Sequence, residues 1–288
     1  MAPQTRFNVP QRPLTGAAVP RRESLLDARA APAPFASGRD QAVERPVVTP
    51  AGVLAWRERL APGSILPVPT RAILALDSGA LGRLRRRRGF REQRGPAGRF
   101  WAVRGRSDES GPTGLLAVTG VGGPVVAVAI EELVALGARE VISIGLAGGL
   151  GGASSGDVVV LDGALPRDGT SGAYGSTDRR LAPDESLRAE VVARLEHAGL
   201  SHLSGPSWTT DAVYRETPAR LGEAINAGAV AVEMEAAAVL AVSRALGARA
   251  AAIVVIADRI VDGQWLPPDD LARCRRAEAG VIDALLDR

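Results

Sequence analysis

The chain has 288 residues, of which 46% are hydrophobic but only 3% aromatic, so a sizeable core must be built from Ala, Val, Leu and Ile. All 35 basic residues are arginine, and their small excess over 32 acidic residues gives a net charge of +3, which does not require a nucleic-acid partner. The absence of lysine excludes a Schiff-base lysine and a lysine-bearing phosphate loop.

The cysteine and histidine content narrows the classes further. Cys274 is the single cysteine, which excludes an internal disulfide and favours a reducing, cytoplasmic location. The two histidines, His197 and His202, have no partner at metal-ligand spacing, so we expect no bound metal and no other cofactor. No apolar run approaches the roughly 20 residues of a membrane span, and we expect no membrane partner.

The N-terminal part of the chain differs in composition from the rest. Residues 1–65 are rich in Pro, Ala and Arg and lack a sustained hydrophobic period, which predicts a flexible segment with one short helix at 51–60. From residue 66 to residue 288 the sequence predicts one folded domain.

Within this domain, short apolar runs alternate with helical patterns. We expect strands at 71–77, 100–105, 114–120, 139–150, 156–164, 227–234 and 249–258, and helices at 81–94, 123–138, 184–200, 235–248 and 267–287. Several strands are almost continuously apolar, as strands covered on both faces are. The pattern therefore predicts a three-layer α/β domain.

Polar or glycine-rich residues follow five of the expected strands. They are Asp77, "TGVGGP" at 119–124, "GLAGG" at 145–149, "EMEA" at 233–236, and Asp258. Because ligands of such folds bind at the carboxyl ends of strands, we expect all five to face one crevice, where Glu235 and Asp258 would meet.

A pair of carboxyl groups at these positions suits one kind of chemistry. A carboxylate at a helix start, Glu235, can accept the protons of two vicinal hydroxyl groups of a ribose, and a second acid at a buried strand end, Asp258, can protonate a leaving group. Together they suit cleavage of a glycosidic bond. The alternative is structural: Glu235 is a first-turn acid favoured by the helix dipole, and Asp258 is a turn residue.

The segments "TGVGGPVVAVAIEELVALGAR", "GLAGGLGGASSGDVVV", "RDGTSGAYG", "TTDAVY" and "VEMEAAAVLAV…IAD" occur in an order and at spacings that resemble the nucleoside phosphorylase superfamily, which includes purine and uridine phosphorylases and nucleosidases. The resemblance covers residues 71–262. It implies an α/β/α domain with a central mixed sheet, a small-molecule nucleoside as substrate, and a homo-oligomer, either a dimer or a hexamer.

The resemblance also implies roles for individual residues. Glu235 would bind the ribose hydroxyl groups, Met234 would pack under the sugar, and Asp258 would protonate the departing purine. Tyr214 would lie at the edge of the base pocket, and Glu233 would be structural or a second sugar contact.

Three further residues, Thr119, Gly120 and Gly122, would line the floor near sugar and phosphate, where a side chain would obstruct close approach.

The chain departs from the family pattern where phosphate should bind. Asp77 is kept in the opening loop, but Leu76 and Ala80 stand where the family has glycine and arginine. In the strand around 143–146, Ser143 and Leu146 stand where another arginine and a Ser or Thr are expected. A buried phosphate needs charged partners, so these departures weaken phosphate binding.

One nearby arginine, Arg83, is a candidate replacement for anion binding together with Ser143, although Arg83 also fits the solvated arginine run at 85–88. With phosphate as co-substrate, the chain would be a phosphorylase-type pentosyltransferase that cleaves a nucleoside or makes it in reverse. The Gln and Arg that read uracil are absent after "TTDAVY", which favours a purine-like base.

Three alternatives remain open. Water could replace phosphate, as in a nucleoside hydrolase, with Asp77 as the nearby acid. The chain could be a nucleoside-binding paralogue without turnover. Nucleic-acid binding through the arginine-rich segment 83–95 is disfavoured, because that run lacks interleaved aromatic residues of the kind that stack on bases.

Overall fold

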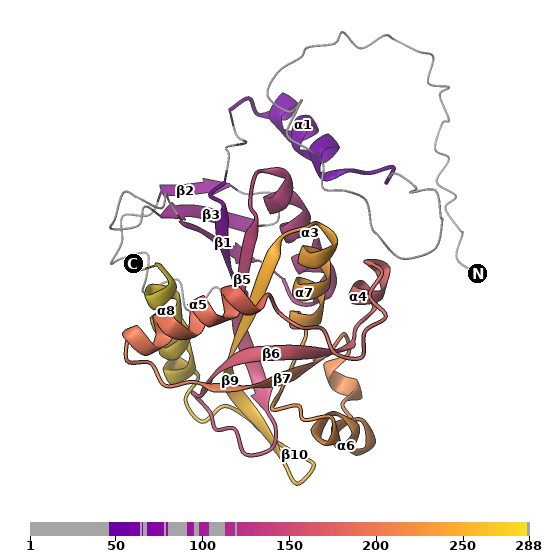
Figure 1. The fold of residues 1–288 in the computed structure, drawn as a ribbon, viewed down its shortest axis with the longest axis vertical. Coiled ribbons are helices and arrows are strands. Elements are labelled where there is room, and N and C mark those ends of the chain that lie inside the picture. The colour runs from indigo at the N-terminus through magenta and orange to yellow at the C-terminus, as the bar shows by residue number, and fades with distance from the viewer. Residues whose placement is uncertain are drawn as a thin grey trace, which may run out of the picture. The chain divides into compact units, whose positions relative to one another are not determined.

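The computed structural model describes residues 46–63, 65, 68–77, 79, 91–94, 98–103, 113–118 and 120–286 (Figure 1). Its helices are α1 (Pro50–Leu60), α3 (Gly123–Ala135), α4 (Gly169–Ala173), α5 (Glu185–His197), α6 (Pro218–Asn226), α7 (Ala236–Ala245), α8 (Leu271–Leu286) and the short 3₁₀ helix η1 (Val213–Arg215). Its strands are β1 (Arg71–Ala75), β2 (Arg91–Arg94), β3 (Gly98–Val103), β4 (Thr113–Val118), β5 (Glu140–Gly149), β6 (Val158–Arg167), β7 (Leu203–Thr210), β8 (Ala231–Glu233), β9 (Arg249–Val261) and β10 (Gln264–Leu266).

The strands form one mixed sheet in the order β10-β9-β6-β7-β8-β5-β1-β4-β3-β2, with a further pairing between β9 and β5. That pairing closes β5, β9, β6, β7 and β8 into a ring of strands, while β1 to β4 extend from β5 as an open sheet. The expected central mixed sheet is confirmed. Parallel pairs, such as β1 with β5, and antiparallel pairs, such as β6 with β9, occur side by side.

Helices cover both faces of the sheet. Along β1, Ala72 and Leu74 pack into a core with α3 and α7, whereas Ile73 and Ala75 pack into a second core with α5 and α8. Figure 1 shows α5 and α8 on one side of the long strands β5 and β9, and α3 and α7 on the other. This burial of alternate side chains on opposite faces explains the continuous apolar runs and gives the expected α/β/α layers.

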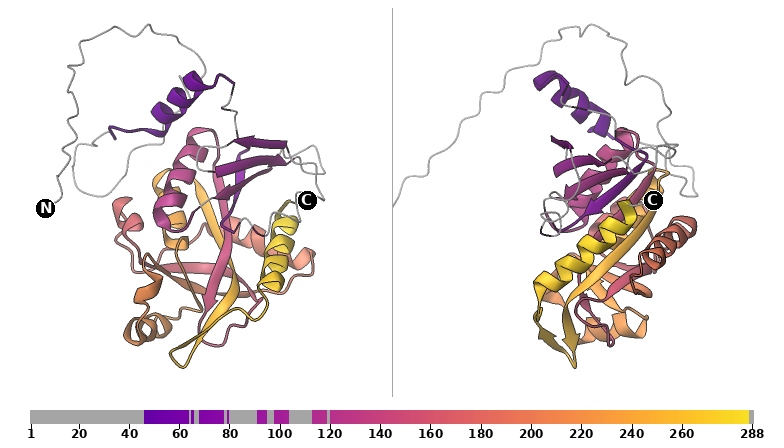
Figure 2. Two further views of the ribbon diagram at one scale, coloured as in Figure 1. Left: turned by 180° about the vertical axis from the view of Figure 1, so that it is seen from behind. Right: turned by 90° about the vertical axis from the view of Figure 1, so that its left-hand side faces the viewer.

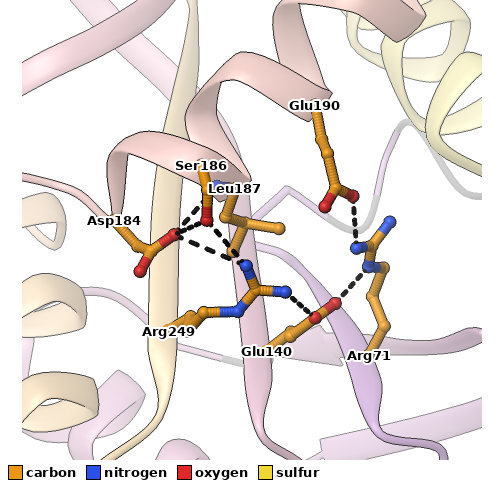
Figure 3. A network of polar contacts seen from close by, with 7 residues as sticks. All are labelled: Arg71, Glu140, Asp184, Ser186, Leu187, Glu190 and Arg249. Atoms are coloured by element: carbon orange, nitrogen blue, oxygen red, sulfur yellow. Dashed lines mark hydrogen bonds and ion pairs between the residues drawn. The ribbon is translucent and has the colours of Figure 1, made fainter.

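A ladder of ion pairs crosses the sheet where β1, β5 and β9 begin (Figure 3). Arg71, Glu140 and Arg249 are register partners on these strands. Arg71 Nε lies 2.6 Å from Glu140, Arg249 binds the other oxygen of Glu140, and α5 contributes Glu190 at 2.6 Å from Arg71 and Asp184 at 3.6 Å from Arg249. Because each pairing depends on the strands meeting at the right residue, the ladder favours one register.

The prediction of a helix at 81–94 is wrong for residues 91–94, the part of this segment that the structure describes. Residues 91–94 form β2, which pairs antiparallel with β3, and residues 81–90 lie outside the described part of the chain. Pairing with a neighbouring strand overrides the weak helical pattern of an arginine-rich segment.

The strand expected to stop at Asp258 continues to Val261 and turns back into β10, which pairs antiparallel with it. The turn residues Asp262 and Gly263 both have positive φ, 50° and 74°, the geometry of a tight hairpin with an Asp-Gly turn. Asp258 is therefore a residue within a strand and not the end of one.

Helix α1 lies within the segment expected to be flexible. Leu54 is buried, and Arg57 reaches Glu132 of α3 at 3.3 Å. The proposed boundary at residue 65 thus follows a helix that contacts the folded domain. None of the helices in the described residues is long and apolar enough to cross a membrane.

Candidate active site

The N-terminus of α7 meets the glycine-rich turn that follows β4. The Oε1 atom of Glu235, the residue preceding α7, accepts a hydrogen bond from the backbone N–H of Gly122 at 2.6 Å. Gly122 and Gly120 have φ of 98° and 143°, which side chains disfavour, so these glycines are needed for the turn itself. Two segments 113 residues apart in the sequence are joined at this point.

Glu235 is only 9% exposed. Burial, and then the neighbouring charge of Glu233, raise its pKa to about 7. Its carboxylate form is therefore available at and above neutral pH, and a bound hydroxyl donor would favour that form further.

Glu233 has a different task from Glu235. One of its oxygens accepts from the Ser207 hydroxyl at 3.0 Å and from the Thr209 hydroxyl, and the other accepts from the backbone N–H groups of Glu235 and Ala236 at 2.7 and 2.6 Å. Burial raises the pKa of Glu233, and these donors oppose that effect. The geometry makes Glu233 the cap of α7, which supports the structural reading over a sugar contact.

Strand β7 supplies this support, and the sequence did not predict it as a strand. Ser207 and Thr209 lie on β7 and are fully buried. The segment "SHLSGPSWTT" has no alternation of apolar and polar residues, so periodicity could not find it. The spacing of Ser207 and Thr209, two residues apart as side chains on one face of a strand are, was the sequence feature that could have indicated this strand.

Asp258 lies on β9, two residues after Ile256, where the pairing of β9 with β5 shifts its register between Ala147 and Gly149. A Cβ on Gly148 would lie 3.3 Å from Asp258 Oδ2 and 3.0 Å from Val232 Cγ1. Gly148 is also the register partner of Val232, two residues before Met234. A single glycine therefore separates Asp258 from the strand that leads into Met234 and Glu235, and the half-buried Met234 lies between β8 and α7.

Glu216 was not among the residues expected at the site. It follows η1, in the loop after "TTDAVY", and is half-buried. Burial, and then the charge of Asp258, raise its pKa to about 7. Its position two residues after "TTDAVY" could have marked Glu216 as a candidate site residue from the sequence.

The other matched segments adjoin each other. The backbone N–H of Gly169 donates to Asp211 at 2.7 Å, which joins "RDGT" to "TTDAVY". A Cβ on Gly123 would lie 2.7 Å from Thr170 Oγ1, so the turn after β4 touches α4. Tyr214, expected at the edge of the base pocket, is 97% exposed.

Asp77 does not join Glu235. Its carboxylate binds Arg275 of α8 at 2.7 Å and accepts from the backbone N–H of Gly79 at 2.7 Å. A Cβ on Gly79 would lie 2.4 Å from Arg275 Nε, which shows how closely the end of the arginine side chain approaches this loop. Glu278, one turn along α8, is fully buried, and burial followed by the charge of Asp77 raises its pKa to about 8. The carboxylate of Asp77 is thus directed at the helix layer opposite α3 and α7.

The remaining candidates contribute less. Ser143 is 2% exposed on β5, opposite Leu74 and Ala252 and before the strand's carboxyl end. Thr119 and Arg83 lie outside the described residues. Within the described part of the chain, no group of three His, Cys, Asp or Glu side chains could hold a metal ion.

Comparisons with known proteins identify relatives of this chain. A family model described as "Phosphorylase superfamily" matches residues 70–287. A guanosine phosphorylase of Halorubrum lacusprofundi is 36% identical over 146 residues, 50% of this chain and 61% of that protein. A uridine phosphorylase of Treponema pallidum is 29% identical over 150 residues, 48% of this chain and 58% of that protein. The matches thus span about three fifths of these curated relatives.

Among solved structures, a purine nucleoside phosphorylase from Toxoplasma gondii in complex with immucillin-H superposes with a TM-score of 0.67 at 21% identity, and covers 76% of this chain and 89% of that one. At this identity the likeness concerns the fold.

Proposed function

The chain belongs to the phosphorylase superfamily, and on that premise we propose that it cleaves the N-glycosidic bond of a purine-like nucleoside with phosphate as acceptor, or forms that bond in reverse. The observation that carries the proposal is the hydrogen bond from Gly122 to Glu235 at the start of α7. Asp258 lies nearby, because only Gly148 separates it from Val232 on the strand that leads to Glu235. The identity to a guanosine phosphorylase supports a purine-like base.

In the proposed reaction, Glu235 accepts hydrogen bonds from the ribose 2′- and 3′-hydroxyl groups and fixes the sugar, with Met234 beneath it. As the bond between C1′ and the base nitrogen breaks, Asp258 gives a proton to the departing base. Phosphate forms the new bond to C1′ from the opposite side. Glu233 acts indirectly, because it holds the backbone of Glu235 in place.

The acceptor is the point where the residues depart from the family pattern, since Ala80 and Leu146 replace its phosphate ligands. A hydrolase would instead need a base that activates water, and Asp77 was the residue available for that task. Its carboxylate is bound to Arg275 and to the Gly79 N–H, which counts against Asp77 as that base and leaves phosphate as the proposed acceptor.

We also propose a homo-oligomer, a dimer or a hexamer, in the cytoplasm. Val121, just before α3, and Val128, on α3, are 67% and 52% exposed, and apolar side chains of this size gain from being covered. Light scattering at micromolar concentration should give a multiple of the chain mass of 29.8 kDa, and the mass of one chain would contradict the proposal.

The test of the activity is a panel of purine and pyrimidine nucleosides incubated with and without phosphate, with released base measured by chromatography. The proposal expects purine release that depends on phosphate. Equal release without phosphate would make the chain a hydrolase, and no release from any nucleoside would make it a binding protein without turnover.

A further inference from the structure

The hairpin formed by β9 and β10 brings a tryptophan to the carboxyl group of Asp258. Trp265 lies on β10, opposite Ile260 of β9, and its indole N–H donates to Asp258 Oδ2 at 2.7 Å. At the same time 63% of Trp265 is exposed. The edge of the ring is therefore bound to the acid, while most of the ring surface is open.

We propose that Trp265 positions Asp258 and provides the surface on which the base of the substrate stacks. The inference deepens the proposed function, on which it rests. Both tasks concern the leaving base. The edge of the Trp265 ring orients Asp258, which protonates the base, and the face of the ring stacks on the base.

The positioning task follows from the chemistry of indole, which can only donate a hydrogen bond. With Oδ2 of Asp258 occupied as an acceptor, Oδ1 is the oxygen left to carry a proton and to point at the base. Without the indole N–H, the carboxyl group could turn about its last torsion and offer either oxygen in several directions. The hydrogen bond therefore raises the fraction of Asp258 that is oriented for proton transfer.

The stacking task is consistent with the small number of aromatic residues in the chain. Aromatic residues are only 3% of the chain, so few side chains are available to stack on a base. Trp265 supplies a large flat ring beside the proposed proton donor, from a hairpin that the sequence analysis did not expect. Stacking of a base on an aromatic side chain contributes about 1–3 kcal/mol and tolerates different bases.

Glu216 is a second acid near Asp258, since burial and then the charge of Asp258 raise its pKa. The surroundings of Asp258 thus include both an indole N–H donor and another acid.

The test separates the two tasks by substitution. Trp265→Phe keeps an aromatic face but removes the N–H donor, whereas Trp265→Ala removes both. Trp56→Ala is the matched control, because Trp56 is also exposed, at 52%, but lies on α1 away from Asp258. Each full-length variant is assayed with phosphate on a purine nucleoside and on its 7-methyl derivative, whose base already carries a positive charge.

We expect Trp265→Phe to lower kcat for the ordinary nucleoside by about tenfold, the size of one hydrogen bond to a charged group. Its KM should stay within about twofold, and the 7-methyl substrate should be unaffected. We expect Trp265→Ala to raise KM for both substrates by about tenfold in addition, because stacking is lost. Trp56→Ala should match the wild type.

Wild-type kinetics for Trp265→Ala on both substrates would overturn the inference and leave the proposed function standing. If the wild type releases no base at all, the proposed function fails, and adenine titrated against tryptophan fluorescence decides the inference alone. Quenching that is lost in Trp265→Phe but kept in Trp56→Ala supports it, and quenching unchanged by Trp265→Phe, or absent from the wild type, overturns it.

Discussion

At the scale of single residues, two acids in neighbouring positions have opposite tasks. Glu233 and Glu235 are separated by one residue, yet both oxygens of Glu233 accept hydrogen bonds within the protein, whereas Glu235 accepts from the backbone alone, at Gly122 and Met234. The difference arises because β8 ends between them, so that one side chain faces β7 and the other faces the turn after β4.

The first prediction concerns Glu235→Gln. The amide oxygen can still accept from Gly122, but the side chain is neutral and binds two hydroxyl donors more weakly than a carboxylate does. KM for a ribonucleoside should therefore rise and kcat should fall by about tenfold or more. A 2′,3′-dideoxy nucleoside should show almost no difference between the two proteins. Equal losses on both substrates would show that Glu235 is structural.

Glu235 also makes a prediction for stability. Its pKa is raised in the folded protein to about 7 from 4.5, so the folded state binds the proton more tightly and loses stability as pH rises from about 4.5 to about 7. Glu235→Gln removes this loss. Urea unfolding should therefore show the variant more stable than wild type at pH 8 by on the order of 1–3 kcal/mol, with no such gain at pH 4. A gain that is the same at both pH values would contradict the assignment.

The next prediction concerns Asp258→Asn, which removes the proposed proton donor but keeps an oxygen that can accept from Trp265. Turnover of an ordinary purine nucleoside should fall by about 10²–10⁴, the usual contribution of general acid catalysis. A 7-methylpurine nucleoside should be much less affected, since its base leaves without needing a proton. The measurement is kcat for both substrates, and equal damage would make Asp258 a structural residue.

At the scale of elements, the support of α7 by β7 decides the position of the site. Thr209 donates to Glu233 and accepts from the backbone N–H of Ala237 at 3.0 Å, so one hydroxyl ties β7, β8 and α7 together. The strand has fully buried serine and threonine side chains because each has such a partner.

Thr209→Val should therefore destabilise the protein by about 1–3 kcal/mol, since the shape is kept while a buried N–H and a buried carboxylate each lose a partner. Denaturant unfolding at pH 7 measures the change. Thr177→Val is the control, because Thr177 is exposed and its substitution should change the free energy of unfolding by less than about 0.5 kcal/mol. Similar effects of the two substitutions would contradict the proposed support.

The outcome at this scale shows what periodicity can detect. Strands β1, β5 and β9 and helices α3, α5, α7 and α8 have long apolar patterns, and the sequence predicted them. Strand β7 lacks such a pattern, because its stability comes from pairing with β6 and β8, which are separated from it in sequence by helices. Strand β10 is only three residues long, too short to show a pattern. The Asp-Gly pair at 262–263 is a local hairpin signal. It was missed because the expected strand ended at Asp258.

At the scale of the whole molecule, the ion-pair ladder of Arg71, Glu140 and Arg249 holds the central strands at the end opposite the site (Figure 2 shows the long strands β5 and β9 side by side). Burial by itself would raise the pKa of Glu140, but the two arginines lower it below its ordinary value. The ladder therefore stabilises the protein above pH 4.5, and this contribution is lost as pH falls through the lowered pKa.

Glu140→Gln should cost about 1–3 kcal/mol of unfolding free energy at pH 7, because Arg71 and Arg249 each lose one of their two charged partners. The difference from wild type should shrink as the pH falls below 4.5 and through the lowered pKa of Glu140, and should vanish where Glu140 is protonated in both states. Denaturant unfolding across pH measures it. A cost that does not depend on pH would show that charge has no part in the effect.

The sequence by itself determined the family, the mixed α/β/α class, and the segments that carry Glu235 and Asp258, because these depend on local apolar patterns and on motifs of adjacent residues. Only the tertiary structure decided that Glu233 caps α7, that Asp77 turns to Arg275 on α8, and that Trp265 and Glu216 lie near Asp258. Each of these contacts joins residues whose partners are set by strand order and by the face of the sheet on which a side chain emerges. Those two properties arise from the closure of β5, β9, β6, β7 and β8 into a ring, which no local stretch of sequence encodes.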